Sequence, residues 1–92
     1  MALKRVEVHY AGRVHGVGFR FTTERFAAAY KVVGYVKNLA DGRVELVAES
    51  EEETLKGFLE AIRQDMGHLV TKYSINWFPP TGEFKRFEVR FF

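Results

Sequence analysis

The chain has 92 residues, of which 47% are apolar and 28% are charged, and its 14 Lys and Arg residues exceed its 12 Asp and Glu residues by two. This length and composition predict one folded domain spanning residues 1–92 and exclude intrinsic disorder. No apolar run approaches the roughly 20 residues that a membrane span needs. No polybasic segment favours nucleic acid, so neither a membrane nor a nucleic acid is expected as a partner.

The chain contains no Cys, which excludes disulfides and thiolate chemistry and favours a cytoplasmic location. Its N-terminus lacks the apolar core of a signal peptide. Amide side chains are rare, since Asn38, Asn76 and Gln64 are the only ones. Together with the charged fraction, this scarcity favours a thermostable protein.

The first third of the chain predicts a strand, a loop and a helix. Residues 4–12 alternate between apolar and polar types, as in a half-buried strand. Residues 13–19 contain two glycines and predict a loop. A helix is expected from residue 20 or 22 to residue 33, with an apolar face of Phe26, Tyr30 and Val33. Gly34 is then expected just past its C-terminal end.

The middle of the chain predicts a hairpin and a second helix. Residues 35–39 and 43–49 form the two strands, and Asp41-Gly42 forms the turn. Ser50, with Glu53 three positions later, predicts a capping box at the start of the second helix. The apolar stripe of that helix consists of Leu55, Phe58, Leu59, Ile62 and Met66.

Two more strands are predicted in the last third. One carries Tyr73, Ile75 and Trp77 on one face and ends before two prolines, and the other alternates around Phe87, Val89 and Phe91. The order strand–helix–strand–strand–helix–strand, plus a final strand, predicts an α+β fold. We expect a ferredoxin-like βαββαβ sandwich, with both helices on one face of a mostly antiparallel four- to five-stranded sheet.

Residues 12–20 combine a strand end, a glycine-rich loop and a helix start. Glycines let successive backbone N–H groups point into one concavity, and a helix start adds unpaired N–H groups and a positive dipole end. Arg20 supplies a planar fork of donors that matches a phosphate or a carboxylate. The segment is therefore a candidate anion-binding site, and the alternative is a tight turn followed by a surface Arg.

Asn38 lies near the end of the second predicted strand, just before a turn. Asn at such a position is often only a turn residue. In the predicted topology, however, this strand lies near the first one, which would bring Asn38 close to the anion site. Its amide could then hold a water through the carbonyl oxygen and contact a substrate oxygen through the NH2 group.

These two segments resemble the signatures of the acylphosphatase family. The run Gly16-Val17-Gly18-Phe19-Arg20 matches the Gly-Val-x-Phe/Tyr-Arg core that ends the family's phosphate loop. The run Gly34-Tyr35-Val36-Lys37-Asn38, followed after three intervening residues by Gly42-Arg43-Val44, resembles the second signature. Order, spacing, chain length and element order agree, so the resemblance covers essentially the whole chain.

The resemblance implies an enzyme that hydrolyses small acyl phosphates to a carboxylate and inorganic phosphate, without metal or cofactor; we expect a monomer. Arg20 would bind the phosphoryl group together with backbone N–H groups, and Asn38 would position the attacking water. The implied substrate-binding residues are His15, Gly16, Val17, Gly18, Phe19 and Arg20. Phosphoryl transfer mainly needs charge stabilisation and in-line positioning, which these residue types can supply.

Three positions depart from the family pattern. His15 stands where Gln is usual, which would alter substrate affinity or pH response at the border of the loop. Leu39 follows Asn38 where a hydroxyl residue is common, so one hydrogen bond that orients the Asn is expected to be missing. Ser50 stands where Gly is usual and is expected to cap the second helix without affecting the chemistry.

Two other functions compete with this prediction. A nucleic-acid-binding module shares the element order, but residues 43–49 hold two acids and no aromatic residue where an RNA-recognition domain carries its basic and aromatic signature. A non-catalytic acylphosphatase-like domain, of the kind found in larger carbamoyl-transfer proteins, would not need both Arg20 and Asn38. The three His residues show no metal-ligand pattern, and packing explains Trp77-Phe78 better than a stacking platform does.

Overall fold

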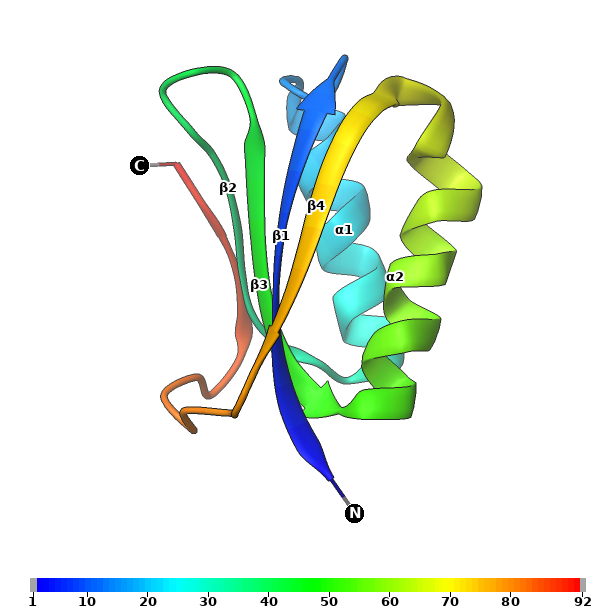
Figure 1. The fold of residues 1–92 in the computed structure, drawn as a ribbon. Coiled ribbons are helices and arrows are strands. Elements are labelled where there is room, and N and C mark those ends of the chain that lie inside the picture. The colour runs from blue at the N-terminus through cyan, green and yellow to red at the C-terminus, as the bar shows by residue number, and fades with distance from the viewer. Residues whose placement is uncertain (1, 92) are drawn as a thin grey trace.

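The computed structural model describes residues 2–91, apart from the side chain of Val17. Within that range one sheet contains the strands β1 (Leu3–Gly12), β2 (Val33–Asn38), β3 (Val44–Glu51), β4 (Val70–Phe78) and β5 (Phe87–Arg90). The helices α1 (Val17–Tyr30) and α2 (Glu52–Met66) both cover the same face of the sheet (Figure 1). A 3₁₀ turn at Gly67–Leu69 joins α2 to β4. This arrangement confirms the predicted ferredoxin-like α+β fold.

The strand order is β4-β1-β3-β2-β5. All neighbours are antiparallel except β2 and β5, which are parallel, so the sheet is mixed. Because β1 and β2 both pair antiparallel with β3, they run in the same direction. Val44 of β3 is the partner of Tyr10 on one side and of Asn38 on the other. The end of β2 therefore lies beside the loop that follows β1, at the same end of the sheet.

The core lies between the two helices and the inner sheet face. The predicted inward residues of β1 are buried, and so is the predicted stripe of α2 except for the half-buried Leu59. The buried face of α1 differs from the expected one, because Tyr30 is exposed and Phe26 is only half-buried. The residues that α1 buries, at a spacing of about one helical turn, are Phe19, Arg20, Thr23 and Ala27.

The limits of α1 correct the expected ones at both ends. The helix begins at Val17, and Gly16 is its N-cap residue in an extended conformation. The first-turn N–H groups of a helix have no intrahelical acceptor, so glycine residues are tolerated at this end. It ends at Tyr30, where Lys31 adopts a left-handed conformation with φ 58°. The Val32 N–H donates to the Ala27 carbonyl over 3.0 Å, and its side chain is buried, which completes the C-terminal cap.

Gly34 is not the helix cap but a residue of β2. Its φ is +143°, and a Cβ atom placed on it would lie 1.9 Å from the Val47 carbonyl oxygen. Close approach of β2 to β3 therefore requires glycine at this position.

The capping box predicted at the start of α2 does not form. Ser50 belongs to β3, where it pairs with Lys4, and the N-cap residue is Glu51, whose side chain makes no capping hydrogen bond. Instead, the Glu52 N–H donates to the Ala2 carbonyl over 3.1 Å. The strand ladder keeps Ser50 out of the cap, and the N-terminal segment satisfies the helix start.

The outer sheet face is partly covered by the segment between β4 and β5, and Glu49 holds that segment in place. Its buried carboxylate accepts hydrogen bonds from the backbone N–H groups of Thr81 and Gly82, both over 3.0 Å, and from the Thr81 hydroxyl and Arg5. Burial would raise the pKa of Glu49, but these donors hold it below its usual value.

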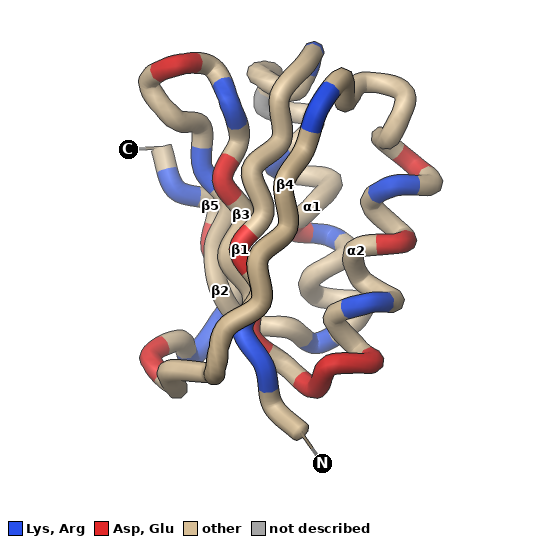
Figure 2. Tube along the Cα trace, viewed as in Figure 1, with Lys and Arg blue, Asp and Glu red and all other residues tan. Residues whose placement is uncertain are grey.

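Positive and negative residues are interspersed along the chain in Figure 2, without an extended band of one sign. Among residues 2–91, no helix is both long and apolar enough to cross a membrane.

Candidate active site

The loop between β1 and α1 is fixed to the fold at two points. Gly12 has a φ of +129°, and the next residue, Arg13, donates its N–H to the Leu69 carbonyl over 2.7 Å. Val14 is fully buried in the core. The residues that follow are thereby held at the start of α1.

Gly16 and Gly18 stand in open space. Neither has a positive φ, and no atom lies within 4 Å of the position that a Cβ would take. Neither backbone conformation nor packing inside the protein therefore requires glycine at these two positions. A ligand that approaches the backbone closely would require it. The loop thus leaves room beside the first turn of α1.

The start of α1 is electrostatically unusual. Its first turn has no acidic residue and no side-chain cap, and its fourth residue is the cation Arg20. A cation near the positive end of a helix dipole is unfavourable. The second helix follows the ordinary rule, with Glu52 and Glu53 in its first turn and Arg63 in its last. The start of α1 therefore concentrates positive potential that an anion would neutralise.

Arg20 is buried, with 6% of its surface exposed. Its Nε has no hydrogen-bond partner among residues 2–91, and no carboxylate in that range forms an ion pair with it. The guanidinium carbon lies 5.0 Å from the centroid of the Phe91 ring, just beyond the end of β5. One face of the guanidinium group is thus supported by an aromatic ring. A buried guanidinium nitrogen that no described residue pairs with is costly unless an anion binds it.

Asn38 reaches the same loop from the end of β2, as the topology predicts. Its Nδ2 donates to the His15 carbonyl over 3.1 Å, and its Oδ1 is buried without a partner. The amide therefore ties β2 to the loop and keeps one acceptor free. Among the described side chains, the buried polar atoms without a hydrogen-bond partner are Arg20 Nε and Asn38 Oδ1. They belong to the two residues that the sequence proposes as catalytic.

The other predicted site residues divide into backbone and side-chain roles. The Phe19 side chain is buried and packs edge-on against Tyr10, with ring centroids 5.3 Å apart, so only its backbone can face the site. Its N–H donates to the Gly16 carbonyl over 3.3 Å. The His15 side chain is exposed. The predicted contact of Val17 can be placed only through the backbone, because its side chain lies outside the described atoms.

Two neighbours of the site were not predicted. Thr23 is fully buried, and its hydroxyl donates to the Phe19 carbonyl over 2.9 Å, one turn back along α1. Phe91 stacks on Arg20 from the far end of the chain. The signal for Thr23 is its spacing of four from Phe19, whereas nothing in the sequence links Phe91 to Arg20. Burial raises the pKa of the nearby Tyr10 hydroxyl, which keeps it neutral and unsuited as a base.

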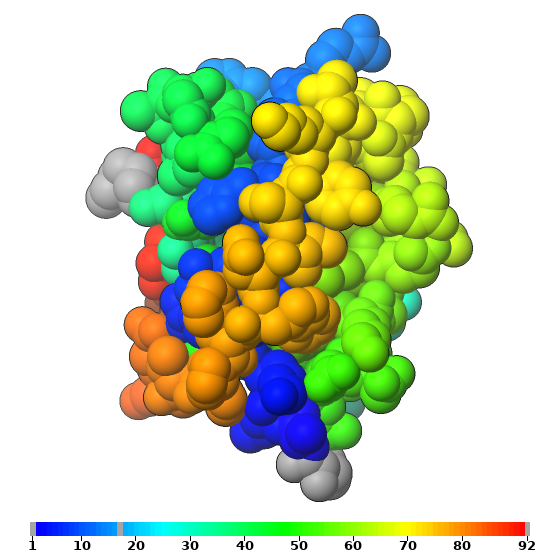
Figure 3. Space-filling view, in the orientation of Figure 1, coloured from blue at the N-terminus to red at the C-terminus, as the bar shows by residue number. Residues whose placement is uncertain are grey.

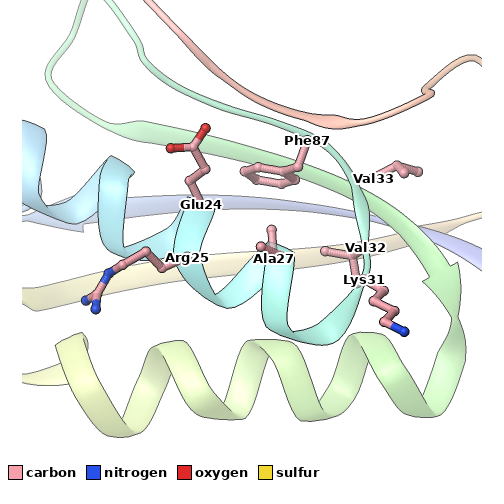
Figure 4. A pocket seen from close by; sticks show the side chains of 8 residues that line it. Glu24, Arg25, Ala27, Lys31, Val32, Val33 and Phe87 are labelled. Carbon is pink, nitrogen blue, oxygen red and sulfur yellow. The ribbon is translucent and has the colours of Figure 1, made fainter.

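A hollow of about 590 Å³ lies elsewhere, between α1 and β5 (Figure 4). The charged groups of Glu24, Arg25 and Lys31 point away from its apolar centre. It includes neither Arg20 nor Asn38, so its size alone does not make it the active site. Among residues 2–91, no cluster of three His, Asp or Glu side chains is placed to hold a metal ion.

The sequence model of the family described as Acylphosphatase matches residues 6–89. The chain belongs to the acylphosphatase family. It is 42% identical to an acylphosphatase of Methylococcus capsulatus over 88 residues, which cover 95% of this chain and 96% of that protein. It is 57% identical to an acylphosphatase of Bacillus velezensis over 53 residues, which cover 58% of this chain and 59% of that protein.

Solved acylphosphatase structures have the same fold. The crystal structure of acylphosphatase from Bacillus subtilis superposes with a TM-score of 0.86 at 35% identity, over 95% of this chain and 98% of that one. The fold also occurs as a small part of a larger protein, HypF of T. kodakarensis. That match has a TM-score of 0.80 at 32% identity and covers 95% of this chain but only 12% of HypF.

Proposed function

We propose that this acylphosphatase family member hydrolyses small acyl phosphates, with the first turn of α1 as the phosphate site. The observation that carries the proposal is that the buried unpartnered atoms of Arg20 and Asn38 coincide with the two signature residues. The family match supports the reaction class. Buried polar atoms without a partner, such as Arg20 Nε and Asn38 Oδ1, destabilise the free protein. A ligand that forms hydrogen bonds with them removes this cost, as expected at a functional site.

Arg20 is proposed to bind the phosphoryl group together with backbone N–H groups of residues 15–20. The guanidinium fork matches two phosphoryl oxygens, and the helix dipole favours the same anion. Charge on these oxygens changes little in a loose transition state, so prearranged donors are the main requirement. The open space at Gly16 and Gly18 supports close approach of the phosphate to the backbone.

Asn38 is proposed to position the water. Its Oδ1 can accept one water hydrogen while Nδ2 stays on the His15 carbonyl. The water oxygen attacks phosphorus, the bond between phosphorus and the acyl oxygen breaks, and the carboxylate leaves with the bonding electrons. A phosphoryl oxygen takes the proton of the water, so the products are a carboxylate and inorganic phosphate. No metal or cofactor takes part in these steps.

We further propose that one chain forms the complete catalytic unit, since Arg20, Asn38 and the loop come from the same chain. A cytoplasmic location is supported by the absence of Cys, and thermostability by the rarity of amides. Neither a membrane nor a nucleic acid is proposed as a partner.

The test is hydrolysis of benzoyl phosphate in excess EDTA, with the wild type beside Arg20→Ala. We expect activity that the chelator leaves unchanged and that Arg20→Ala lowers at least about a hundredfold. A strict requirement for added magnesium or zinc would refute the metal-free mechanism. The second candidate is a non-catalytic acylphosphatase-like domain, since the same fold also forms a small part of the larger HypF. A wild type that binds phosphate without hydrolysing benzoyl phosphate would favour this candidate.

A further inference from the structure

The strand β4 forms one edge of the sheet and pairs only with β1 among the described strands. Its inward-facing row of Tyr73, Ile75 and Trp77 is 59%, 39% and 41% exposed. Figure 3 views this edge from outside, and the atoms of β4, yellow to orange, run down the near face beside α2, without another segment over them. An apolar row on an open strand edge is a surface for pairing with another strand.

Devices that normally block such pairing are scarce on β4. Lys72 is the only charged residue of β4 (Figure 2). The strand contains no proline, and Pro79 comes directly after its end. The opposite edge, β5, has four residues, of which Glu88 and Arg90 are charged. Natural edge strands are usually protected by shortness, charges, prolines or bulges. The sheet therefore has one protected edge and one open edge.

A groove of about 360 Å³ runs between β4 and α2. On the helix side it is lined by the apolar side chains of Leu59 and Ile62 and by charged residues of α2. The same three residues of β4, Tyr73, Ile75 and Trp77, line the strand side of the groove. A partner strand on the open edge would place its own side chains over this groove.

We propose that the occupant of this edge is a second copy of the chain, paired antiparallel through β4 about a two-fold axis at Ile75. In this register residue 75 faces its own copy, and Tyr73 faces Trp77 of the other copy. Ser74 then faces Asn76, and Lys72 faces Phe78. Each pair joins side chains of compatible chemistry on the same face, so the strand is complementary to itself in this register.

The charge on β4 is compatible with this register. With the axis at Ile75, the two Lys72 residues lie six positions apart along the paired strands, roughly 20 Å. That separation exceeds the screening length of about 8 Å at physiological salt, so their repulsion is weak. An axis at residue 72 would instead place the two ammonium groups side by side. Lys72 thus opposes a pairing centred on itself and does not oppose the one centred on Ile75.

The expected association is weak. The exposed parts of Tyr73, Ile75, Trp77 and Phe78 amount to roughly 350 Å² in each copy, from aromatic areas of 150–250 Å² per side chain. Both copies together give roughly 700 Å², below the limit of about 1,000 Å² for a stable specific interface, so the association must be weak. We expect a dissociation constant on the order of 0.1 mM. The chain would then be a monomer in a dilute activity assay. Asn38 of the proposed active site lies on β2, three strands away from β4 in the sheet order.

Cysteine crosslinking tests the register, because the chain has no native Cys. We expect Ile75→Cys to form a covalent dimer under diamide, since directly opposed residues have Cα atoms about 4.5–5.5 Å apart, within disulfide reach. Tyr73→Cys alone and Trp77→Cys alone should stay monomeric, because their copies lie about 13 Å apart. An equimolar mixture of those two variants should crosslink. Self-crosslinking of Tyr73→Cys with none for Ile75→Cys would overturn the proposed register.

Sedimentation equilibrium tests the association itself, without a covalent link. We expect concentration-dependent dimers of the wild type, at least tenfold weaker association for Ile75→Lys, and restored association when Ile75→Lys is mixed with Ile75→Glu. Leu3→Lys is the matched control, because it adds the same charge at an apolar side chain that is 58% exposed on another strand. A wild type that stays monomeric up to about ten times the expected dissociation constant overturns the proposal, whether or not the edge binds an extended peptide.

Discussion

Arg20 offers a test in which stability and activity move in opposite directions. Replacing it by Met keeps most of the alkyl chain and removes the charge. The dipole repulsion that disappears is about 0.3–1 kcal/mol, and the unsatisfied buried Nε that disappears costs about 1–3 kcal/mol. The lost interaction with the Phe91 ring is about 0.5–1 kcal/mol. These ranges combine to a net stabilisation of about 0.3–3.5 kcal/mol for Arg20→Met, so we expect a value on the order of 1 kcal/mol.

For a domain of this size, 1 kcal/mol corresponds to a rise in Tm of roughly 4–8 °C. Differential scanning calorimetry in phosphate-free buffer measures it. Phosphate at a hundred times its Kd should stabilise the wild type by about 2.7 kcal/mol and leave Arg20→Met unaffected. Hydrolysis of benzoyl phosphate should fall at least about a hundredfold. Arg20→Lys should restore little activity, because a point charge does not reproduce the planar fork.

Two results would refute this reasoning. If Arg20→Met loses more than about 5 °C in Tm, Arg20 is a structural residue whose charge is satisfied in the free protein. If the variant keeps more than about a tenth of the wild-type kcat/KM, it contributes less than about 1.4 kcal/mol to the transition state. The phosphate site would then lie elsewhere.

Three further predictions test neighbouring parts of the structure. Asn38→Ala should lower kcat about a hundredfold while phosphate still raises Tm; near-normal kcat in a folded variant would make Asn38 only a link to the His15 carbonyl. Gly18→Ala should raise Tm, because Ala favours a helix by up to about 1 kcal/mol, and should lower kcat/KM by narrowing the open space beside the backbone; unchanged kinetics would show that no ligand uses that space. Glu49→Gln should lower the free energy of unfolding by about 2 kcal/mol in urea at neutral pH, because it weakens hydrogen bonds to a buried carboxylate. Since the pKa of Glu49 is lowered by folding, its contribution is complete above the ordinary value of 4.5 and is lost as the pH falls through the folded value. A deficit of Glu49→Gln that stays constant through that acidic range would contradict this assignment.

The sequence predicts the order of the elements because the apolar period is clear in β1 and α2. It misplaces the start of α1 because glycine lowers helix propensity, and a pattern cannot show that Gly16 and Gly18 stand at a helix start with open space around them. It misreads Gly34 because a glycine after a helix favours a cap, whereas the close Val47 carbonyl is a tertiary feature.

The site was predictable to the extent that topology determines it. Two parallel strands that share one neighbour bring Asn38 to the loop after β1, and the hydrogen bond to His15 follows from that adjacency. The ring of Phe91 over Arg20 was not predictable, because it depends on β5 pairing parallel with β2 at the far end of the chain. Alternation in β5 gives the side of the sheet on which Phe91 lies, but not the residue it meets.

The two helices differ in how the charges at their ends suit the helix dipole. The second helix has acids at its first turn and Arg63 at its last, so its charges stabilise it. The first helix has no acid at its start and buries Arg20 there, whose Nε has no hydrogen-bond partner among residues 2–91. Both helices pack on the same sheet face, so packing does not account for the contrast. The charges of α2 thus suit its dipole, whereas those at the start of α1, within a family signature, do not. Such a local violation is expected at a site where a bound anion would neutralise the positive charge.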